Sequence, residues 1–365
     1  MSEWQTFCLK DLGKIVGGAT PSTNNPKNYG NKIAWITPKD LSTLQGRYIE
    51  KGSRSISRLG FKSCSCVLLP KHAILFSSRA PIGYVAIAKK RLCTNQGFKS
   101  IIPNKKIYFE FLYYLLKYHK DNISNISGGT TFKEVSGATL GLFEVKIPPT
   151  YYEQQKIART LSILDQKIEN NHKINELLHT LAYKIYEYYF KYKPKNAKLE
   201  QIIIENPKSN IMVKNAQKTQ DKYPFFTSGD NILSYPKAII DGRNCFLNTG
   251  GNAGIKFYVG KASYSTDTWC ICANEFSDYL YLLLSSIKNH INQSFFQGTS
   301  LKHLQKNLLK KYPIYMPSAH EIKKFNQIII PLLTLISINT RTSKKLEQIR
   351  DFLLPLLLKQ QVKPK

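Results

Sequence analysis

The sequence predicts an α+β fold with a pseudo-twofold internal repeat, in which two similar mixed α/β units are joined by two long antiparallel helices that form a coiled coil. Three observations predict it. Segments of the first half recur in the second half at a nearly constant offset. Each half ends in a long run with apolar residues at heptad spacing. Short apolar stretches separated by Gly and Pro precede each run, as expected of strands and turns.

The internal repeat is clearest in two motifs. Gly129–Lys133 recurs as Gly298–Lys302, an offset of 169, and Val145–Pro148 recurs as Ile314–Pro317 at the same offset. A repeat of this length is a domain rather than a solenoid unit. We therefore predict four parts: a first unit over 1–152, a first long helix over 153–193, a second unit over 194–320 and a second long helix over 321–365.

The two predicted helices share a heptad seam. From Ile157 the seam residues follow at alternating steps of four and three, and adding 168 to each position gives a matching second series. Two such stripes should pack on each other, and a shared layer of Asn171 and Asn339 would fix their register. The seam residues are Ile157, Leu161, Leu164, Ile168, Asn171, Asn175, Leu178, Ala182, Ile185 and Tyr189 in the first helix, and Phe325, Ile329, Leu332, Ile336, Asn339, Ser343, Leu346, Arg350, Leu353 and Leu357 in the second.

The two stripes need not pack on each other. Each stripe could instead pack on its own globular unit, as ordinary amphipathic helices do. The first helix would be roughly 58 Å long at about 1.5 Å per residue, which is more than a unit of this size needs, so coiled-coil pairing is favoured. Pro331 and Pro355 interrupt the second segment and predict a kink or a late start there.

Charge points to a polyanionic partner. The chain of 365 residues has 53 Lys and Arg against 24 Asp and Glu, a formal net charge of +29, which favours nucleic acid. Between Glu50 and Glu110 there are twelve bases and no acid, among strand-like stretches. From Tyr279 to His320 there are five lysines and no acid. These runs can supply phosphate contacts.

Candidate DNA-contacting residues come from these runs and from the repeated segments, because basic and amide side chains contact phosphates and base edges. In the first unit they are Arg54, Arg58, Lys62, Arg79, Lys89, Lys90, Arg91, Asn95, Gln96, Lys99, Thr130, Thr131 and Lys133. In the second unit they are Asn248, Asn252, Lys256, Lys261, Thr299, Ser300 and Lys302.

The sequence predicts neither a catalytic site nor a metal site. Pro148–Tyr151 is similar to the Asn-Pro-Pro-Tyr loop of amino-methyltransferases, but Ile147 replaces the group that would accept from the target amine. Gly250–Gly254 lacks the Lys-Ser/Thr ending of a phosphate loop. The two Cys-x-Cys pairs, which begin at Cys64 and Cys270, lack a second ligand pair nearby, and we interpret them as strand residues.

We also expect a cytoplasmic protein. The first residues carry Glu3 and no apolar signal segment, and the most apolar stretch, Ile328–Ile338, is short and contains a proline. Seven cysteines are an odd number, which fits reduced thiols better than a disulfide framework.

A further set of motifs, in order and in duplicate, covers almost the whole chain. The motifs are Trp4, Leu12–Gly13, Gly17–Ser22, Trp35–Leu41, Ile74–Gly83, Asn95–Phe98, Ile147–Pro149, Glu153–Ile157, Leu164–Ile168, Asn248–Gly254, Gly298–Ser300 and Leu353–Leu357. In these motifs and in their order, the chain resembles the specificity (S) subunit of Type I restriction-modification systems. One departure is that Ile322 and Lys323 stand where the first helix has Gln154 and Gln155.

The resemblance implies a non-catalytic subunit that reads DNA. It implies two target-recognition domains, each reading half of an interrupted double-stranded DNA site, and a coiled coil that docks two modification subunits and the restriction subunits. The modification subunits would carry S-adenosylmethionine for adenine methylation, and the restriction (motor-nuclease) subunits would use ATP and magnesium, so this chain would need no cofactor and no membrane. The alternative is a coiled-coil nucleic-acid-binding scaffold without sequence specificity, which competition between DNA sites would distinguish.

Overall fold

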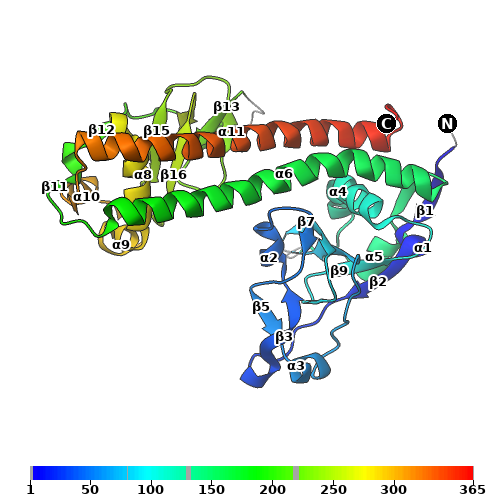
Figure 1. The fold of residues 1–365 in the computed structure, drawn as a ribbon. Helices are drawn as coiled ribbons and strands as arrows, with labels where there is room; N and C mark the ends of the chain where they lie inside the picture. The colour runs from blue at the N-terminus through cyan, green and yellow to red at the C-terminus, as the bar shows by residue number, and fades with distance from the viewer. Residues whose placement is uncertain (1–2, 80, 129–132, 217–221, 365) are drawn as a thin grey trace. The chain divides into compact units, whose positions relative to one another are not determined.

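The computed structural model describes residues 3–79, 81–128, 133–216 and 222–364. The chain divides into two compact units. Unit 1 is formed by the residues up to Asn170 together with those from Ser343 onward, and unit 2 is formed by Asn171–Thr342. The two long helices, α6 (Tyr151–Tyr186) and α11 (Ala319–Leu358), are drawn in green and in orange to red in Figure 1. Each of them gives one part to each unit.

The described residues of unit 1 form three sheets. Its strands are β1 (Gln5–Cys8), β2 (Gly13–Gly17), β3 (Tyr29–Ile36), β4 (Tyr48–Ile49), β5 (Arg54–Ile56), β6 (Ile74–Ser78), β7 (Ile82–Ala88), β8 (Cys93–Thr94), β9 (Lys99–Pro103) and β10 (Glu144–Ile147). They form a five-stranded sheet in the order β2-β9-β6-β7-β4, a three-stranded sheet β5-β3-β8 and the pair β1-β10. The short helices are α1 (Leu9–Leu12), α2 (Pro38–Ser42), α3 (Arg58–Lys62), α4 (Phe109–Asn125) and α5 (Gly137–Leu142).

Helix α4 is the centre of the unit 1 core. Its apolar residues Phe111, Leu112, Leu115 and Leu116 recur at helical spacing and are all buried. They share one cluster with strands β6 and β7 and with residues of α6 and α11. A second cluster fills the other face of the large sheet, and a third lies around Trp35 of the small sheet.

Unit 2 repeats this plan with shorter strands. They are β11 (Ala197–Lys198), β12 (Ile204–Glu205), β13 (Tyr223–Phe226), β14 (Leu233–Tyr235), β15 (Arg243–Asn248), β16 (Ile255–Val259), β17 (Ser263–Tyr264), β18 (Thr268–Cys272), β19 (Phe296–Gln297), β20 (His303–Leu304) and β21 (Pro313–Ile314). The sheets have the orders β12-β18-β15-β16, β14-β13-β17, β11-β21 and β19-β20. The helices are α7 (Val213–Ala216), α8 (Ser277–Ser286), α9 (Lys288–Ser294) and α10 (Lys306–Lys310).

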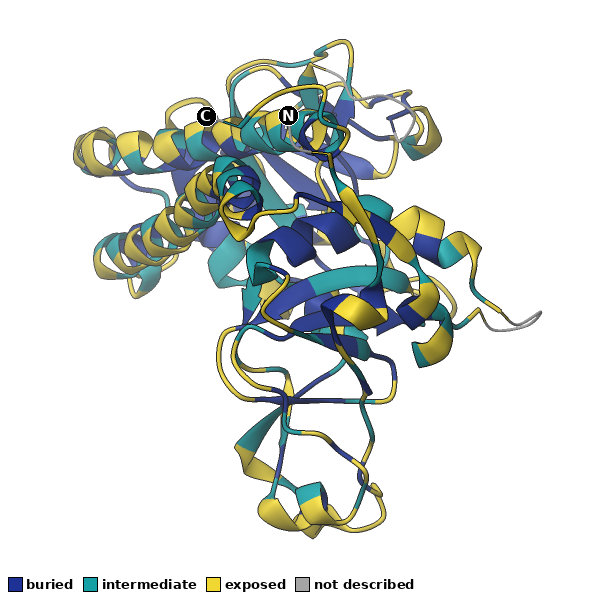
Figure 2. Cartoon of the chain, turned by 90° about the vertical axis from the view of Figure 1, so that its right-hand side faces the viewer, coloured by how far each residue is buried: buried dark blue, intermediate teal, exposed yellow. Residues whose placement is uncertain are grey.

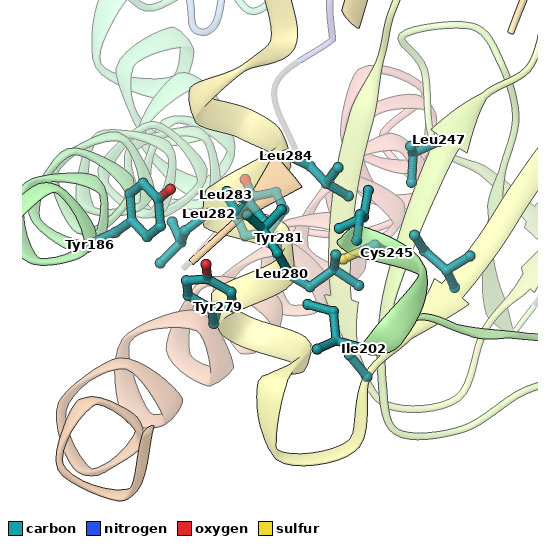
Figure 3. Close-up of a cluster of buried hydrophobic side chains, with 14 of the residues drawn as sticks. Tyr186, Ile202, Cys245, Leu247, Tyr279, Leu280, Tyr281, Leu282, Leu283 and Leu284 are labelled. Carbon is teal, nitrogen blue, oxygen red and sulfur yellow. The ribbon is translucent and has the colours of Figure 1, made fainter. Parts of the chain in front are cut away.

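Helix α8 fills the core of unit 2 as α4 does in unit 1. Figure 3 shows the side chains of Tyr279–Leu284 between Tyr186 of α6 on one side and Cys245 and Leu247 of β15 on the other. Ile202 closes the same cluster. Because α8 touches both the sheet and α6, it fastens the globular part of unit 2 to its coiled-coil part.

The strand pairings confirm the predicted duplication. Strands β6 and β7 form an antiparallel hairpin followed by α4, and β15 and β16 form the same hairpin followed by α8. The pair β1-β10 that precedes α6 has its counterpart in β11-β21, which precedes α11. The predicted α+β class with two similar units is therefore correct.

Within each unit the two long helices run antiparallel. In unit 1, Arg350 bonds Asp165, and in unit 2 the Tyr189 ring lies 5.9 Å from the Phe325 ring. None of the predicted seam residues is exposed: each is buried or half-buried. Asn339 Nδ2 donates to Asn175 Oδ1 at 2.9 Å, so the partner that the structure shows for Asn339 is Asn175, and a layer shared by Asn171 and Asn339 stays a prediction.

The late start expected for the second helix is wrong. Helix α11 begins at Ala319 and runs through Pro331 and Pro355 without interruption, so neither proline delays its start. Pro331 removes the hydrogen bond to the carbonyl of Gln327. Both of these residues are exposed, so water can take the place of the missing donor. Among the described residues, no helix is both long enough and apolar enough to cross a membrane.

A buried arginine ties the globular part of unit 1 to α6. Arg47 is 3% exposed, and its guanidinium lies 2.9 Å from Glu110 of α4 and 3.1 Å from Glu169 of α6. The Arg47 backbone N–H also donates to Glu169 Oε1 at 2.9 Å. Arg47 thus balances two carboxylates that are themselves largely buried.

We expect Arg47→Met to destabilise unit 1 by about 3 kcal/mol, because it leaves Glu110 and Glu169 without their buried partner. Urea unfolding followed by far-ultraviolet circular dichroism measures this loss. The exposed Lys51→Met is the matched control and should change stability by less than about 0.5 kcal/mol. Equal stability of the two variants would show that the arginine does not hold α6.

Candidate nucleic-acid interface

A hydrogen-bonded edge of loops is built at the same place in both units. In unit 1, Val135 N–H donates to the Ser78 carbonyl at 3.0 Å, and Ser78 N–H donates to the Gly97 carbonyl at 2.8 Å. These bonds join the segment that begins at Lys133 to the end of β6 and to the turn before β9. We call this set of three chain segments the loop edge of unit 1.

The loop edge of unit 2 has the equivalent bonds. Leu304 N–H donates to the Thr249 carbonyl at 3.0 Å, and Thr249 N–H donates to the Asp267 carbonyl at 3.2 Å. Leu304 follows Val135 at an offset of 169, and Thr249 follows Ser78 at an offset of 171. The sequence repeat is therefore a repeat of main-chain geometry.

The loop edge of unit 1 brings several predicted residues together. Arg79 Nη1 lies 3.6 Å from Glu134 Oε2, and Lys99 Nζ lies 3.0 Å from Glu134 Oε1. Lys133 is exposed next to them. Thr130 and Thr131 lie outside the described residues. The acid Glu134 was not among the predicted site residues, yet it links two of the predicted bases.

The turn that contains Asn95 and Gln96 belongs to the same edge. The Asn95 side chain accepts from Gly97 N–H at 3.0 Å, and Gln96 is exposed and bonds Thr20. Gly18 passes so close that a Cβ there would lie 2.0 Å from the Asn95 carbonyl oxygen, so only glycine fits. Asn95 therefore shapes the turn, while Gln96 is presented at its surface.

Other predicted bases of unit 1 lie on separate surfaces. Arg54 of β5 and Arg58 and Lys62 of α3 are exposed on the outer lobe, which is made of β3, β5 and α3 and carries many exposed residues in Figure 2. Lys89, Lys90 and Arg91 are exposed in the turn after β7, where Lys89 Nζ lies 3.0 Å from Glu50. The structure does not bring these two groups together with the loop edge by any hydrogen bond between the described residues.

In unit 2, two predicted residues are held inside the fold. Asn248 is 6% exposed and donates to the Asn252 carbonyl at 3.1 Å, and Lys256 Nζ donates to the Thr227 carbonyl at 2.7 Å and to Asn248 Oδ1 at 3.2 Å. Burial lowers the pKa of the Lys256 amine. A Cβ on Gly254 would lie 2.3 Å from Asn248, so glycine is required there. These two residues shape the hairpin turn, and a direct role in DNA contact stays a prediction.

The remaining predicted residues of unit 2 are exposed. Thr299, Ser300 and Lys302 are exposed beside the hairpin turn, and Asn252 is exposed within it. The Lys302 carbonyl accepts from Gly251 N–H at 2.9 Å, which holds the two segments together. Lys261 is exposed at the opposite end of β16.

Polar residues around Asp267 were missed by the sequence analysis. Thr249 Oγ1 donates to the Asp267 carbonyl at 2.7 Å, and Ser228 bonds the same carbonyl. The offset of 171 that relates Thr249 to Ser78 was available in the sequence, but its link to Asp267 depends on long-range pairing. Within the described ranges, no group of three or more His, Cys, Asp or Glu side chains is arranged to hold a metal ion.

Comparison with known proteins agrees with this duplicated architecture. The family model described as Type I restriction modification DNA specificity domain matches residues 1–180 and 195–348. The MjaIX specificity subunit of a Type I restriction enzyme from Methanocaldococcus jannaschii is 33% identical over 98% of this chain and 93% of that protein. The HindI specificity subunit from Haemophilus influenzae is 31% identical over 46% of this chain and 37% of that protein.

A solved structure shares the fold. The S subunit of a Type I restriction-modification system from M. genitalium has a TM-score of 0.64 at 18% identity and covers 97% of this chain and 96% of that chain. The sequence matches confirm the resemblance predicted from the motifs, including the prediction that this chain is the non-catalytic subunit of its complex. The chain belongs to the Type I restriction modification DNA specificity domain family, as a specificity subunit that recognises DNA targets.

Proposed function

We propose that this subunit reads a bipartite double-stranded DNA site, with one half-site read by the globular part of each unit. The observation that carries the proposal is the loop edge, which is built twice with equivalent main-chain hydrogen bonds. Each edge presents different side chains: Arg79, Gln96 and Lys133 in unit 1, and Asn252 and Lys302 in unit 2. Two similar frames with different surface groups suit two half-sites of different sequence.

We further propose that the coiled coil docks the modification subunits through a second apolar stripe. In unit 2, α6 exposes Ile174, Leu177 and Leu181, Tyr188 is exposed just after its last residue, and Leu177 is 70% exposed. Their steps of three, four and seven residues are heptad steps, but none of these residues belongs to the seam. A stripe of this kind on a surface helix marks a protein contact.

Helix α11 adds a matching stripe in the same unit. Ile328, Leu335 and Ile338 are exposed. At 3.6 residues per turn, about 100° per residue, Ile328 and Leu335 lie on the side of the helix opposite Ser337, which bonds the globular part. On α6 the exposed stripe likewise lies opposite His179, which contacts Tyr281. The two stripes thus lie on the same side of the helix pair in unit 2, where apolar helices of a partner would complete a helical bundle.

The partner subunits would supply the chemistry. We propose two modification subunits, which bring S-adenosylmethionine and methylate adenine, and restriction subunits, which bring ATP and magnesium, while this chain binds no cofactor. The complex would act in the cytoplasm, where its DNA substrate is present.

Mapping of methylated adenines tests the bipartite site. The chain is expressed with its modification subunits in a cell that lacks other adenine methylation, and the modified positions are sequenced across the genome. We expect one motif with two specified segments and an unread spacer of fixed length. Thr299→Ala/Ser300→Ala should alter only one segment. Methylation without a motif would favour the non-specific scaffold instead.

Removal of charge from the outer lobe should weaken DNA binding without changing sequence preference. We expect Arg54→Ala/Lys62→Ala to lower the slope of log affinity against log salt by about one for each lost phosphate contact. Titration of specific and non-specific duplexes with the reconstituted methyltransferase measures both quantities. Lys105→Ala/Lys106→Ala removes the same charge elsewhere in unit 1 and serves as control. A changed sequence preference with an unchanged slope would assign these residues to base contacts.

Charge placed on the exposed α6 stripe should block assembly. Leu177→Glu/Leu181→Glu should weaken binding of the modification subunit by at least about tenfold, since it places two carboxylates in an apolar contact. Thermal unfolding should be unchanged because both side chains are exposed. Thr180→Glu, exposed on the same helix but outside the stripe, is the control. Unchanged binding of the double variant would mean that the partner docks elsewhere.

A further inference from the structure

A buried ion pair crosses between α6 and α11 in unit 1. Arg350 Nη1 of α11 donates to Asp165 Oδ1 of α6 at 2.7 Å, and the two side chains are 13% and 5% exposed. Tyr114 OH of α4 donates to the other carboxylate oxygen, Oδ2, at 2.5 Å. Burial, and then the Asp165 charge, raise the pKa of the Tyr114 hydroxyl, which therefore remains a donor. Both oxygens of Asp165 are satisfied only when Arg350 is present.

The internal repeat breaks at all three of these positions. At the offset of 168 the counterparts of Asp165, Arg350 and Tyr114 are Leu333, Ala182 and Leu282. These three residues are 1%, 0% and 2% exposed and belong to one apolar cluster of unit 2. A polar set in one unit thus corresponds to an apolar set in the other, although the surrounding helices keep their register.

This difference matters because the two helices share a seam. Antiparallel pairing places position 165 against position 350, and the repeat makes 182 the equivalent of 350 and 333 the equivalent of 165. The α6 helix of one chain could therefore pair with α6 of a second copy, and α11 could pair with α11 of that copy. At most seam positions apolar residues would still face apolar residues. In such a homotypic pair Asp165 would face Ala182, and Arg350 would face Leu333.

A homotypic pair would bury charges that lack their cross-helix partners. Removing one partner of a buried ion pair is strongly unfavourable, because the remaining charge has lost its water and gained nothing in return. Arg350 also bonds Asp351 at 2.9 Å, and that neighbour on α11 would remain with it. Asp165 would keep the Tyr114 hydroxyl and the nearby charge of Lys117, both from α4 of the same half, but its Oδ1 would lose the Arg350 guanidinium.

Another break in the repeat does not have this effect. Gln154 corresponds to Ile322, and it accepts from Tyr108 N–H at 2.7 Å and donates to the Lys106 carbonyl at 3.0 Å. Both partners lie in the same half of the chain as Gln154, so these bonds would persist whichever helix α6 pairs with. Gln154 is therefore a matched control for Asp165.

We propose that the Asp165–Arg350 pair selects α6–α11 pairing and excludes a second copy of the same chain, so that the coiled coil always joins two different halves. Polar residues in helical seams are known to select partners in this way at some cost in stability. This proposal concerns helix pairing and does not depend on the proposed reading of DNA.

The test uses the folded full-length chain with a protease site placed in the exposed segment Tyr192–Asn196. After cleavage the two halves remain paired through the helices. Tagged and untagged wild-type protein are mixed, and the denaturant concentration is raised until the two kinds of protein exchange halves. The denaturant is then removed. Native mass spectrometry counts heterotypic and homotypic pairs. For the wild type we expect heterotypic pairs alone.

The variant Tyr114→Leu/Asp165→Leu/Arg350→Ala copies the apolar set of unit 2 into unit 1. We expect homotypic pairs to rise toward the half that random pairing gives. The reversed pair Asp165→Arg/Arg350→Asp should restore heterotypic pairing, and Gln154→Leu should leave it unchanged. Heterotypic pairs alone in the apolar variant, or homotypic pairs in the wild type, would overturn the proposal. A variant that loses its heterotypic pairs without gaining homotypic ones would also overturn it, because a pair needed only for stability gives that result.

Discussion

The need to cover two matching apolar stripes governs the architecture of this chain. Neither α6 nor α11 can bury its seam alone, and in each unit seam residues of both helices lie in one apolar cluster. Because the helices are antiparallel, each unit receives the start of one helix and the end of the other. Every globular part therefore packs on a platform made from both halves of the sequence, and α4 and α8 are the elements that dock on it.

Much of this could be predicted because it depends on periodicity. Heptad steps from Ile157 identified both helices, and the offsets of 168 to 171 identified the duplicated hairpins and loops. The side-chain contacts could not be predicted in the same way. Arg47 joins Glu110 and Glu169 across a long stretch of chain, and Glu134 sits between Arg79 and Lys99, yet nothing in the local sequence marks these acids as partners. In the sequence Asn248 resembles a surface amide. In the structure its side chain is buried and donates to the Asn252 carbonyl, which holds the turn.

The prolines of α11 show a second limit of local reasoning. A proline inside a helix is expected to end or bend it, but α11 continues through Pro331. The helix continues because the seam on the neighbouring face is continuous and because the unpaired carbonyl of Gln327 lies on an exposed surface. Tertiary burial at Ile329, Leu333 and Ile336 outweighs the local penalty. The polar residues of the helices are informative for the opposite reason: Asp165 and Arg350 are placed where apolar residues would be sufficient for packing, as Leu333 and Ala182 demonstrate in the other unit.

The loop edges are held by bonds between main-chain atoms, and this has an evolutionary consequence. Val135 to Ser78 and Leu304 to Thr249 need only backbone N–H and C=O groups, which every residue other than proline supplies. The side chains that project from these edges can therefore be replaced without dismantling the loops that carry them. For the proposed reading of DNA, a frame of this kind means that a new target would need a few surface substitutions and no new fold.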